Sequence, residues 1–198
     1  MKEFNIIEDF FKAKSIQRKD VIIGIGDDAA VTRIPQGQAL VTTTDTLISG
    51  VHFLADTAPH AIAQKAMAVN LSDLAAMGAE PAWISLSLSL PEVDESWLES
   101  FSEGLREHAI YYSVQLIGGD TVQGPLVITI TAQGFVPFEQ ALTRSQAKPG
   151  DSVYVTGTLG DAGLGLQIAQ KKCVLDVQLN KDYLLNRLNY PTPRLLVG

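Results

Sequence analysis

Between residues 60 and 136 the hydrophobic pattern changes its period from one stretch to the next, and this alternation limits the folds open to the chain. Apolar residues recur at helical spacing in 60–78 and again in 95–112. Between them, "AWISLSLSLP" (82–91) alternates apolar residues with serine, which is typical of a half-buried strand. "VQLIGGDTVQGPLVITITAQGFV" (114–136) follows with two strand patterns around a glycine-rich turn. Strands that alternate with helices predict an α/β or α+β fold, here a mixed sheet with helices on one face.

Three further elements are expected on the N-terminal side of this alternation. "FNIIEDFFKAK" (4–14) has apolar residues at helical spacing, and "DVIIGIG" (20–26) is strand-like. "QALVTTTDTLISGVHF" (38–53) is rich in β-branched residues and predicts a strand that runs into a loop. We therefore expect residues 1–137 to form one domain.

The pattern changes after residue 137. "SVYVTG" (152–157) is typical of a strand, and "TLGDAGLGLQIAQ" (158–170) is a glycine-rich entry into a helix. This order indicates the first strand and helix of another α/β unit. We expect residues 138–198 to be the beginning of a truncated C-terminal domain.

Composition excludes several classes of function. The 198 residues carry 15 Lys and Arg against 22 Asp and Glu, a net charge of −7, with no basic stripe, so nucleic acid is not expected as a partner. No apolar run approaches the roughly 18 residues that span a bilayer, and the N-terminus does not resemble a signal peptide. The single cysteine rules out an internal disulfide. These features favour a cytoplasmic protein without a membrane partner.

Several aspartates lie among small or apolar neighbours and not in charged runs. They are Asp27 and Asp28 after Gly-Ile-Gly, Asp45 at a strand end, Asp73 within a helix, and Asp120 after Gly-Gly. Each could be a turn or cap residue, because aspartate commonly bonds its own backbone there. Their recurrence in four segments instead predicts convergence on one site. Two carboxylates about 4 Å apart repel by roughly 4 kcal/mol at an effective dielectric of ~20, so such a site requires cations.

The residues beside these aspartates indicate which cation. Thr43 and Thr44 place hydroxyl or carbonyl oxygens next to Asp45. Hard oxygen ligands suit Mg²⁺ and not zinc, and Mg²⁺ held by a few carboxylates keeps positions open for substrate phosphates. We therefore expect an aspartate cage filled by Mg²⁺ that binds phosphates.

Other candidates leave two readings open. Gly118 and Gly119 could let the backbone approach a phosphate or could form a simple turn. Arg144 could clamp a phosphate or lie in solvent. His52 could bind an anion or a polar ring. No P-loop is present, and the Gly-Ile-Gly lacks the third glycine of a dinucleotide fingerprint.

Taken together, these motifs resemble a known family. "GIGDDAAV", "TTDTLISGVHF", "KAMAVNLSDLAAMGAEPAWISLSLSLP", "QLIGGDT" and "ALTRSQAKPGD" are similar to the thiamine-monophosphate kinases. That family belongs to the ATP-binding superfamily typified by aminoimidazole ribonucleotide synthetase. The resemblance covers essentially the whole chain and implies transfer of a phosphoryl group from ATP to thiamine monophosphate, giving thiamine diphosphate, with Mg²⁺.

The resemblance also implies roles for individual residues. The ligands of several metal ions would be Asp28, Thr43, Thr44, Asp45, Asp73 and Asp120, with Asp45, Asp73 and Asp120 central to catalysis. The nucleotide would meet Gly119, Asp120 and Arg144, and His52 would meet the thiamine phosphate. Asp27 would bind metal or orient its neighbour. The N-terminal domains of two chains would pair into a homodimer, their sheets joining, with active sites near the interface.

The implied reaction needs little acid or base chemistry. A phosphate monoester is largely a dianion at pH 7, so its oxygen can attack directly, and in-line transfer is expected. Family members continue past residue 198 with further acidic motifs, "SDG" and "GGEDYE" in type. We therefore expect this chain to fold and dimerise yet to lack full activity. The alternatives are another ATP-dependent synthetase of the superfamily, or a non-catalytic dimerising or ligand-binding fragment.

Overall fold

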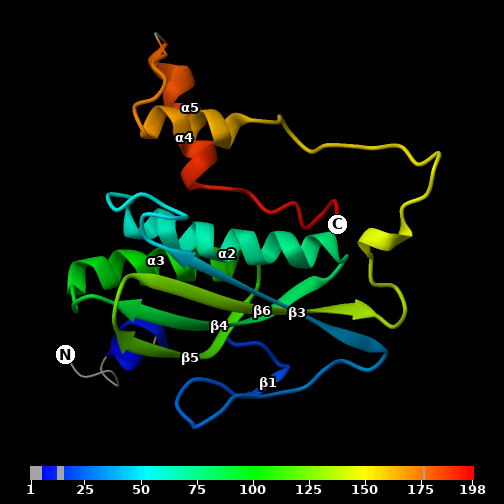
Figure 1. Ribbon diagram of the computed structural model, residues 1–198. Helices are drawn as coiled ribbons and strands as arrows, with labels where there is room; N and C mark the ends of the chain where they lie inside the picture. The colour runs from blue at the N-terminus through cyan, green and yellow to red at the C-terminus, as the bar shows by residue number, and fades with distance from the viewer. Residues whose placement is uncertain (1–5, 13–15, 176) are drawn as a thin grey trace.

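A four-stranded mixed sheet carries two long helices on one face (Figure 1). The computed structural model describes residues 6–12, 16–175 and 177–198. The sheet has the order β3-β6-β4-β5; β4 and β5 are parallel, and the other pairs are antiparallel. The strands are β3 (Gln38–Ile48), β4 (Glu80–Leu90), β5 (Gln115–Gln123) and β6 (Val127–Pro137). The predicted fold class, a mixed sheet with helices on one face, is confirmed.

The two helices are α2 (Pro59–Ala76) and α3 (Glu95–Tyr111). Asp94 caps α3, because its side chain accepts hydrogen bonds from the backbone N–H groups of Ser96 and Trp97 at 2.9 and 3.1 Å. Leu98, Phe101 and Leu105 recur at helical spacing in α3 and are buried. Helix α2 packs against α3 and against β3 and β6. Both helices therefore cover the same face of the sheet.

The main core lies between these helices and the sheet. Phe101, Leu71, Leu88 and Ile130 have at most a trace of exposed surface there. The other face of the sheet is rich in serine and threonine, apart from a small second cluster of Ala82, Trp83, Ile117 and Phe135. The N-terminal segment packs on that cluster through Val21 and Ala30. This segment carries Asp27 and Asp28, the first two of the aspartates singled out in the sequence.

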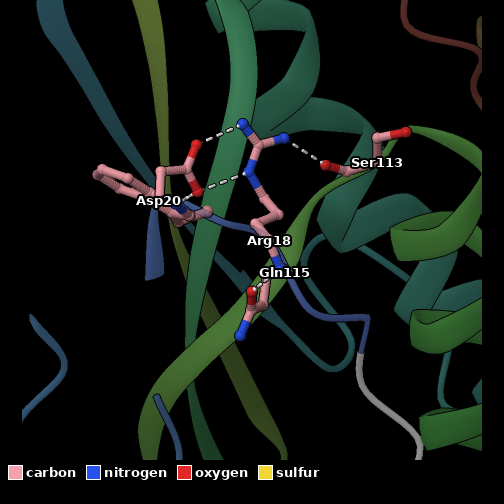
Figure 2. Close-up of polar contacts among 5 residues, drawn as sticks. Arg18, Asp20, Ser113 and Gln115 are labelled. Carbon is pink, nitrogen blue, oxygen red and sulfur yellow. Dashed lines mark hydrogen bonds and ion pairs between the residues drawn. The ribbon is translucent and has the colours of Figure 1, made fainter. Parts of the chain in front are cut away.

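A polar network fixes the N-terminal segment to the sheet (Figure 2). The Arg18 guanidinium donates to both carboxylate oxygens of Asp20, at 3.0 and 2.7 Å, and to the carbonyl of Ser113 at 2.8 Å. The Arg18 backbone N–H donates to Gln115 Oε1 at 2.6 Å, and Trp83 Nε1 donates to Asp20 Oδ1 at 3.0 Å. These contacts tie the start of the segment to β4 and β5.

The N-terminal strand is shorter than its sequence pattern predicts, and the N-terminal helix is described only in part. Residues Ile7–Lys12 form a π-helix, η1, while residues 4–5 and 13–14 of the expected helix lie outside the described residues. The expected strand 20–26 is reduced to β1 (Val21–Ile23), which pairs with β2 (Val31–Thr32) in an antiparallel ribbon. The stretch between β1 and β2 is free to form a loop.

The strand expected over residues 152–157 is absent, which corrects the prediction from "SVYVTG". A strand needs a neighbour for its backbone hydrogen bonds, and none lies beside this stretch in the described part of the chain. Val153 and Tyr154 are accordingly 93% and 88% exposed. The regular elements after residue 137 are η2 (Arg144–Gln146), α4 (Asp161–Ala169) and α5 (Gln178–Asn189). Across the described ranges, none of the helices is both apolar and long enough to cross a bilayer.

Candidate functional site

A cavity of about 840 Å³ lies between η1, the loop after β1, and strands β4 and β5. Three of the singled-out carboxylates line it, from Asp27, Asp28 and Asp120. The backbone of Gly118 and Gly119 lines it as well, and Lys12 enters from η1. The structure therefore brings the first aspartate pair and the Gly-Gly-Asp motif to one place, although they are about 90 residues apart in the sequence.

The turn before the aspartate pair depends on Gly26. Its φ of +121° lies in a region that other residues rarely adopt, and a Cβ there would stand 3.2 Å from Lys12 Nζ. Immediately after it, Asp27 Oδ1 accepts a hydrogen bond from the Asp28 backbone N–H at 2.8 Å. That bond is what an orienting role for Asp27 requires. It leaves the exposed carboxylate of Asp28 available to a ligand.

A β-bulge sets the direction of Asp120. Ile84 pairs with Leu116 and Ser85 with Gly118, so Ile117 is an extra residue in β5. Beyond the bulge, Gly119 faces Leu86 so closely that a Cβ would overlap the Leu86 carbonyl oxygen. Gly119 is thus required by packing, whereas a Cβ on Gly118 would meet open space.

A second group of oxygen ligands lies on the helix-covered side, where α2 meets β3. The Thr43 hydroxyl donates to Asp73 Oδ2 at 2.9 Å, which joins strand to helix. Asp45 is two residues further along β3, and side chains two apart in a strand share a face. Thr43, Asp45 and Asp73 therefore border the same side of the sheet.

The structure does not bring the four aspartates into one cluster, and this corrects the expectation of a single cage within the chain. Asp45 pairs in register with the buried Ile130, whereas Asp120 pairs with Ser87 on the opposite face. Two strands separate them, which is about 14 Å at ~4.8 Å per strand spacing. Within the described ranges, no three His, Cys, Asp or Glu side chains are grouped so as to hold a metal ion. The acidic residues instead form two groups, one at the cavity and one beside α2.

Two other predicted residues lie apart from both groups. Thr44 points to the face opposite Thr43, and its hydroxyl hydrogen-bonds that of Thr131 at 2.9 Å. Arg144 is exposed in η2 and is not among the residues that line the cavity. In Figure 1, η2 is the yellow turn beyond the far end of β6. The structure therefore places neither Thr44 nor Arg144 at the cavity.

His52 lies in a tight turn after β3 and its ring orientation is fixed. The Ile48 backbone N–H donates to His52 Nδ1 at 3.0 Å. Lys65 of α2 donates from Nζ to the His52 carbonyl oxygen at 3.1 Å. Burial lowers the pKa of the Lys65 ammonium. Sequence reasoning missed Lys65, although it is the only Lys or Arg in α2, and this isolation was an available signal.

Sequence reasoning also missed the network around Arg18 and Asp20. Burial by itself raises the pKa of the Asp20 carboxyl, but the hydrogen bonds from Arg18 and Trp83 and the charge of Arg18 outweigh it. The pKa of Asp20 is therefore below its usual value, and the ionised carboxylate is the form that the network stabilises. The pairing between residues 20 and 83 has no local sequence signal.

The layered sheet and its acidic, glycine-lined cavity define a mixed α/β domain with a candidate ligand site beside β4 and β5. Residues 26–136 match the family described as AIR synthase related protein, N-terminal domain. The chain belongs to that family.

Individual relatives agree with the resemblance drawn from the motifs. The chain is 54% identical over 196 residues to the thiamine-monophosphate kinase of Escherichia coli (strain K12), which is 99% of this chain and 60% of that protein. The crystal structure of thiamine-monophosphate kinase from Stenotrophomonas maltophilia K279a matches with a TM-score of 0.87 at 44% identity, covering 98% of this chain and 62% of that one. A structure of AaThiL complexed with AMPPCP and TMP has a TM-score of 0.75 at 35% identity, covering 86% and 55%. The chain thus spans about three fifths of the length of the curated relative from E. coli.

Proposed function

We propose that this chain is the N-terminal, nucleotide- and metal-binding part of a kinase that transfers the γ-phosphoryl group of ATP to thiamine monophosphate, giving thiamine diphosphate. The observation that carries the proposal is the cavity lined by Asp28, Asp120 and the Gly118–Gly119 backbone. It occurs in a chain that is similar over nearly its whole length to thiamine-monophosphate kinases. We further propose that the protein acts in the cytoplasm.

The donor atoms of both acidic groups fit Mg²⁺. Carboxylate and hydroxyl oxygens are the ligands that this ion prefers, and the Thr43 hydroxyl and Asp73 carboxylate already lie 2.9 Å apart. The proposed ligands are Asp28, Thr43, Thr44, Asp45, Asp73 and Asp120. When bound, Mg²⁺ would offset the negative charge of the phosphates. The roles of the chain are to hold these oxygens in place, to orient Asp28 through Asp27, and to present glycine backbone to the nucleotide. We also assign Arg144 to the nucleotide and His52 to the acceptor phosphate.

The transfer itself is proposed to be direct and in line. The acceptor oxygen of a phosphate monoester is already anionic at pH 7, so no side chain has to remove a proton from it. The protein has only to hold the two phosphate groups in line and to offset their negative charge.

We propose that two copies of the chain form a homodimer through the open faces of their sheets. That face carries rows of threonine and serine and leaves Leu40, Ile48 and Val122 between 37% and 48% exposed. Sedimentation equilibrium is expected to give a dimer, and Leu40→Asp is expected to weaken it. A monomeric wild-type chain would contradict the proposal.

We propose that the division between domains falls at residues 137 and 138. The last strand of the sheet ends at Pro137, and the regular elements described beyond it are η2, α4 and α5. Residues 138–198 would then begin a C-terminal domain.

An assay of ADP release with Mg²⁺, ATP and thiamine monophosphate tests the kinase directly. Release that depends on thiamine monophosphate is expected, and it should be faster when the chain is extended to the full length of its relatives. Equal turnover by both versions would show that the extension is dispensable. ATP consumption at a rate that does not depend on thiamine monophosphate would favour another ATP-dependent synthetase. A chain that does not bind ATP would favour a non-catalytic fragment.

Substitution tests the proposed metal ligands. The variants are made in whichever of the two versions, this chain or the extended chain, releases ADP faster. Asp45→Asn and Asp73→Asn should each lower turnover by roughly 100-fold, because a neutral amide holds a divalent cation much more weakly than a carboxylate does. Asp182→Asn, at an exposed position in α5, is the matched control. Circular dichroism should show an unchanged fold in all three. Full turnover by both Asp45→Asn and Asp73→Asn would refute the proposed metal site.

A further inference from the structure

Lys12 is the one basic residue among the described residues that line the cavity of about 840 Å³. The acidic residues that line it are Glu8, Asp27, Asp28 and Asp120. The metal ions that these carboxylates attract would neutralise only part of the charge of a nucleoside triphosphate. Lys12 is therefore the side chain with which the cavity itself can meet a phosphate oxygen directly.

The ammonium of Lys12 lies over the turn that presents the aspartate pair. A Cβ on Gly26 would stand 3.2 Å from Lys12 Nζ and 3.3 Å from its Cε, so the end of the lysine side chain lies beside this glycine. Gly26 comes directly before Asp27 and Asp28, which line the same cavity. The ammonium is ion-paired with Glu8, four residues back in η1, at 2.9 Å from Nζ to Oε2. Lys12 thus joins η1 to the loop that we assign to the nucleotide.

The ion pair between Lys12 and Glu8 is one that a stronger anion can replace. The two side chains are 42% and 61% exposed, and such a pair contributes little to stability because water screens both charges. The ammonium has three N–H donors, and Glu8 accepts from it through one oxygen. A phosphate group carries more negative charge than a carboxylate, and its hydrogen bonds to an ammonium are charge-assisted as well. A phosphate that enters the cavity would therefore compete with Glu8 for the same ammonium.

The helix that carries Lys12 turns one face toward the cavity. Its cavity-lining residues are Ile7, Glu8, Phe11 and Lys12, two pairs spaced four residues apart along η1. Phe11 is buried and belongs to the main core, so it anchors η1, while the Lys12 side chain at the end of the helix stays exposed. π-helical turns are rare and frequently lie at functional sites. The shape of η1 therefore suits a wall that holds a ligand.

We propose that Lys12 binds the polyphosphate chain of the nucleotide and that it exchanges Glu8 for a phosphate oxygen when the nucleotide enters the cavity. This inference rests on the proposed function for the identity of the ligand as a nucleoside triphosphate. Lys12 offsets phosphate charge directly, whereas Asp28 and Asp120 act through the proposed metal ions. Glu8 competes with phosphate for the ammonium, so the two residues of one ion pair have opposite effects on nucleotide binding.

Titration calorimetry of this chain with ATP and Mg²⁺ tests the exchange. Lys12→Met removes the charge but keeps most of the apolar stem, and it should weaken ATP binding roughly 10-fold, as loss of a charged hydrogen bond predicts. Lys12→Arg should recover most of that loss. Glu8→Gln removes the competing carboxylate and should tighten ATP binding about twofold. Lys19→Met, at an exposed lysine that does not line the cavity, is the matched control and should bind ATP as the wild type does.

The opposite signs at Lys12 and Glu8 are what a merely structural ion pair would not produce, because both substitutions break the same contact. Adenosine, which has no phosphate, should bind equally to the wild type and to Lys12→Met, and both should melt at the same temperature to within a few degrees. Equal ATP affinity in the wild type and Lys12→Met would overturn the inference. So would weaker ATP binding in both Lys12→Met and Glu8→Gln, an equal loss of adenosine binding, or a wild-type chain that binds no ATP.

The same variants distinguish failure of the inference from failure of the proposed function. ATP binding that depends on Lys12, without release of ADP in response to thiamine monophosphate by the full-length version, would refute the kinase while supporting the role of Lys12. Release of ADP in response to thiamine monophosphate, with ATP affinity unchanged in Lys12→Met, would refute the role of Lys12 while supporting the kinase.

Discussion

Residues 38–137 and residues 138–198 contain similar numbers of apolar side chains for their length but bury them very differently. In the first region Leu88, Phe101 and Ile130 have no exposed surface, and helices and sheet cover each other. In the second region Val153, Tyr154 and Leu159 are each more than four fifths exposed. Figure 1 shows the first region as two layers and the second as a long open connection that leads to two short helices.

In the second region polar contacts join α4 and α5 beside the buried side chains of Ile168 and Leu184. Tyr183 of α5 donates to Asp161 Oδ2 of α4 at 2.9 Å, and the Thr158 hydroxyl donates to the same oxygen. These hydrogen bonds, with the nearby charge of Arg187, hold the pKa of Asp161 below its usual value. The comparison teaches that an apolar pattern produces a stable element only where a second layer is present to cover it.

Hydrogen exchange should show the largest contrast between the regions. Amides in the middle of β6 are expected to exchange only through global unfolding, whereas amides of 152–157 should exchange several orders of magnitude faster, because they have no strand partner. Mass spectrometry of exchanged peptides measures this directly. Equal protection of the two stretches would break the comparison.

A pair of truncations should give the next largest contrast. Phe101→Ala removes a fully buried ring from the core and should lower the free energy of unfolding by about 3–5 kcal/mol. Tyr154→Ala removes a ring that is 88% exposed and should change it by less than about 0.5 kcal/mol. Urea denaturation followed by circular dichroism gives both values. A cost above 1 kcal/mol at Tyr154 would mean that its ring is covered in solution.

The layered region is also the part that could be predicted from the sequence. The helix expected over 95–112 is α3 at Glu95–Tyr111, and the strand expected over 82–91 is β4 at Glu80–Leu90. These two predictions are correct because each element has a more buried and a less buried face. Apolar residues therefore recur along the sequence with the period of the helix or strand. The pattern over 152–157 is as strand-like, but a strand also needs a partner, and that requirement is not local.

The candidate site was predictable only in part, for a related reason. The contact between Thr43 and Asp73 depends on how α2 packs on β3, but the shared face of Thr43 and Asp45 follows from the expected strand. The relation of Asp45 to Asp120 does not, because the face on which each lies depends on strand order and on the bulge at Ile117. Lys65 gave only the signal of the single Lys or Arg in a mostly apolar helix.

Substitution at Asp20 should have a moderate effect and extends the comparison to the N-terminal segment. Asp20→Asn removes the charge that Arg18 binds and should lower the free energy of unfolding by about 1–3 kcal/mol at pH 7. Because the pKa of Asp20 is lowered by folding, its ionised form stabilises the protein above the unfolded-state pKa, and this contribution is lost as the pH falls through the folded-state pKa.

The gap in stability between wild type and Asp20→Asn should therefore narrow between about pH 5 and pH 2. Urea denaturation across that range, with Trp fluorescence as the probe because Trp83 donates to Asp20, measures the gap. Asp182→Asn, in the C-terminal region and exposed, should show little gap at any pH. If the difference in stability between wild type and Asp20→Asn stayed constant over this pH range, the charge of Asp20 would not stabilise the N-terminal segment.

The smallest effects are expected at two glycines of α4, one of which faces open space while the other packs against α5. A Cβ on Gly163 would meet open space, so Gly163→Ala should favour the helix by up to about 1 kcal/mol through lost unfolded-state entropy. A Cβ on Gly165 would overlap the Leu184 carbonyl oxygen of α5, so Gly165→Ala should separate the two helices. Hydrogen exchange of 178–189 should therefore slow slightly in the first variant and accelerate in the second. If both substitutions slowed it, the close approach of α4 and α5 would not hold in solution, and the C-terminal region would lack even this small packed contact.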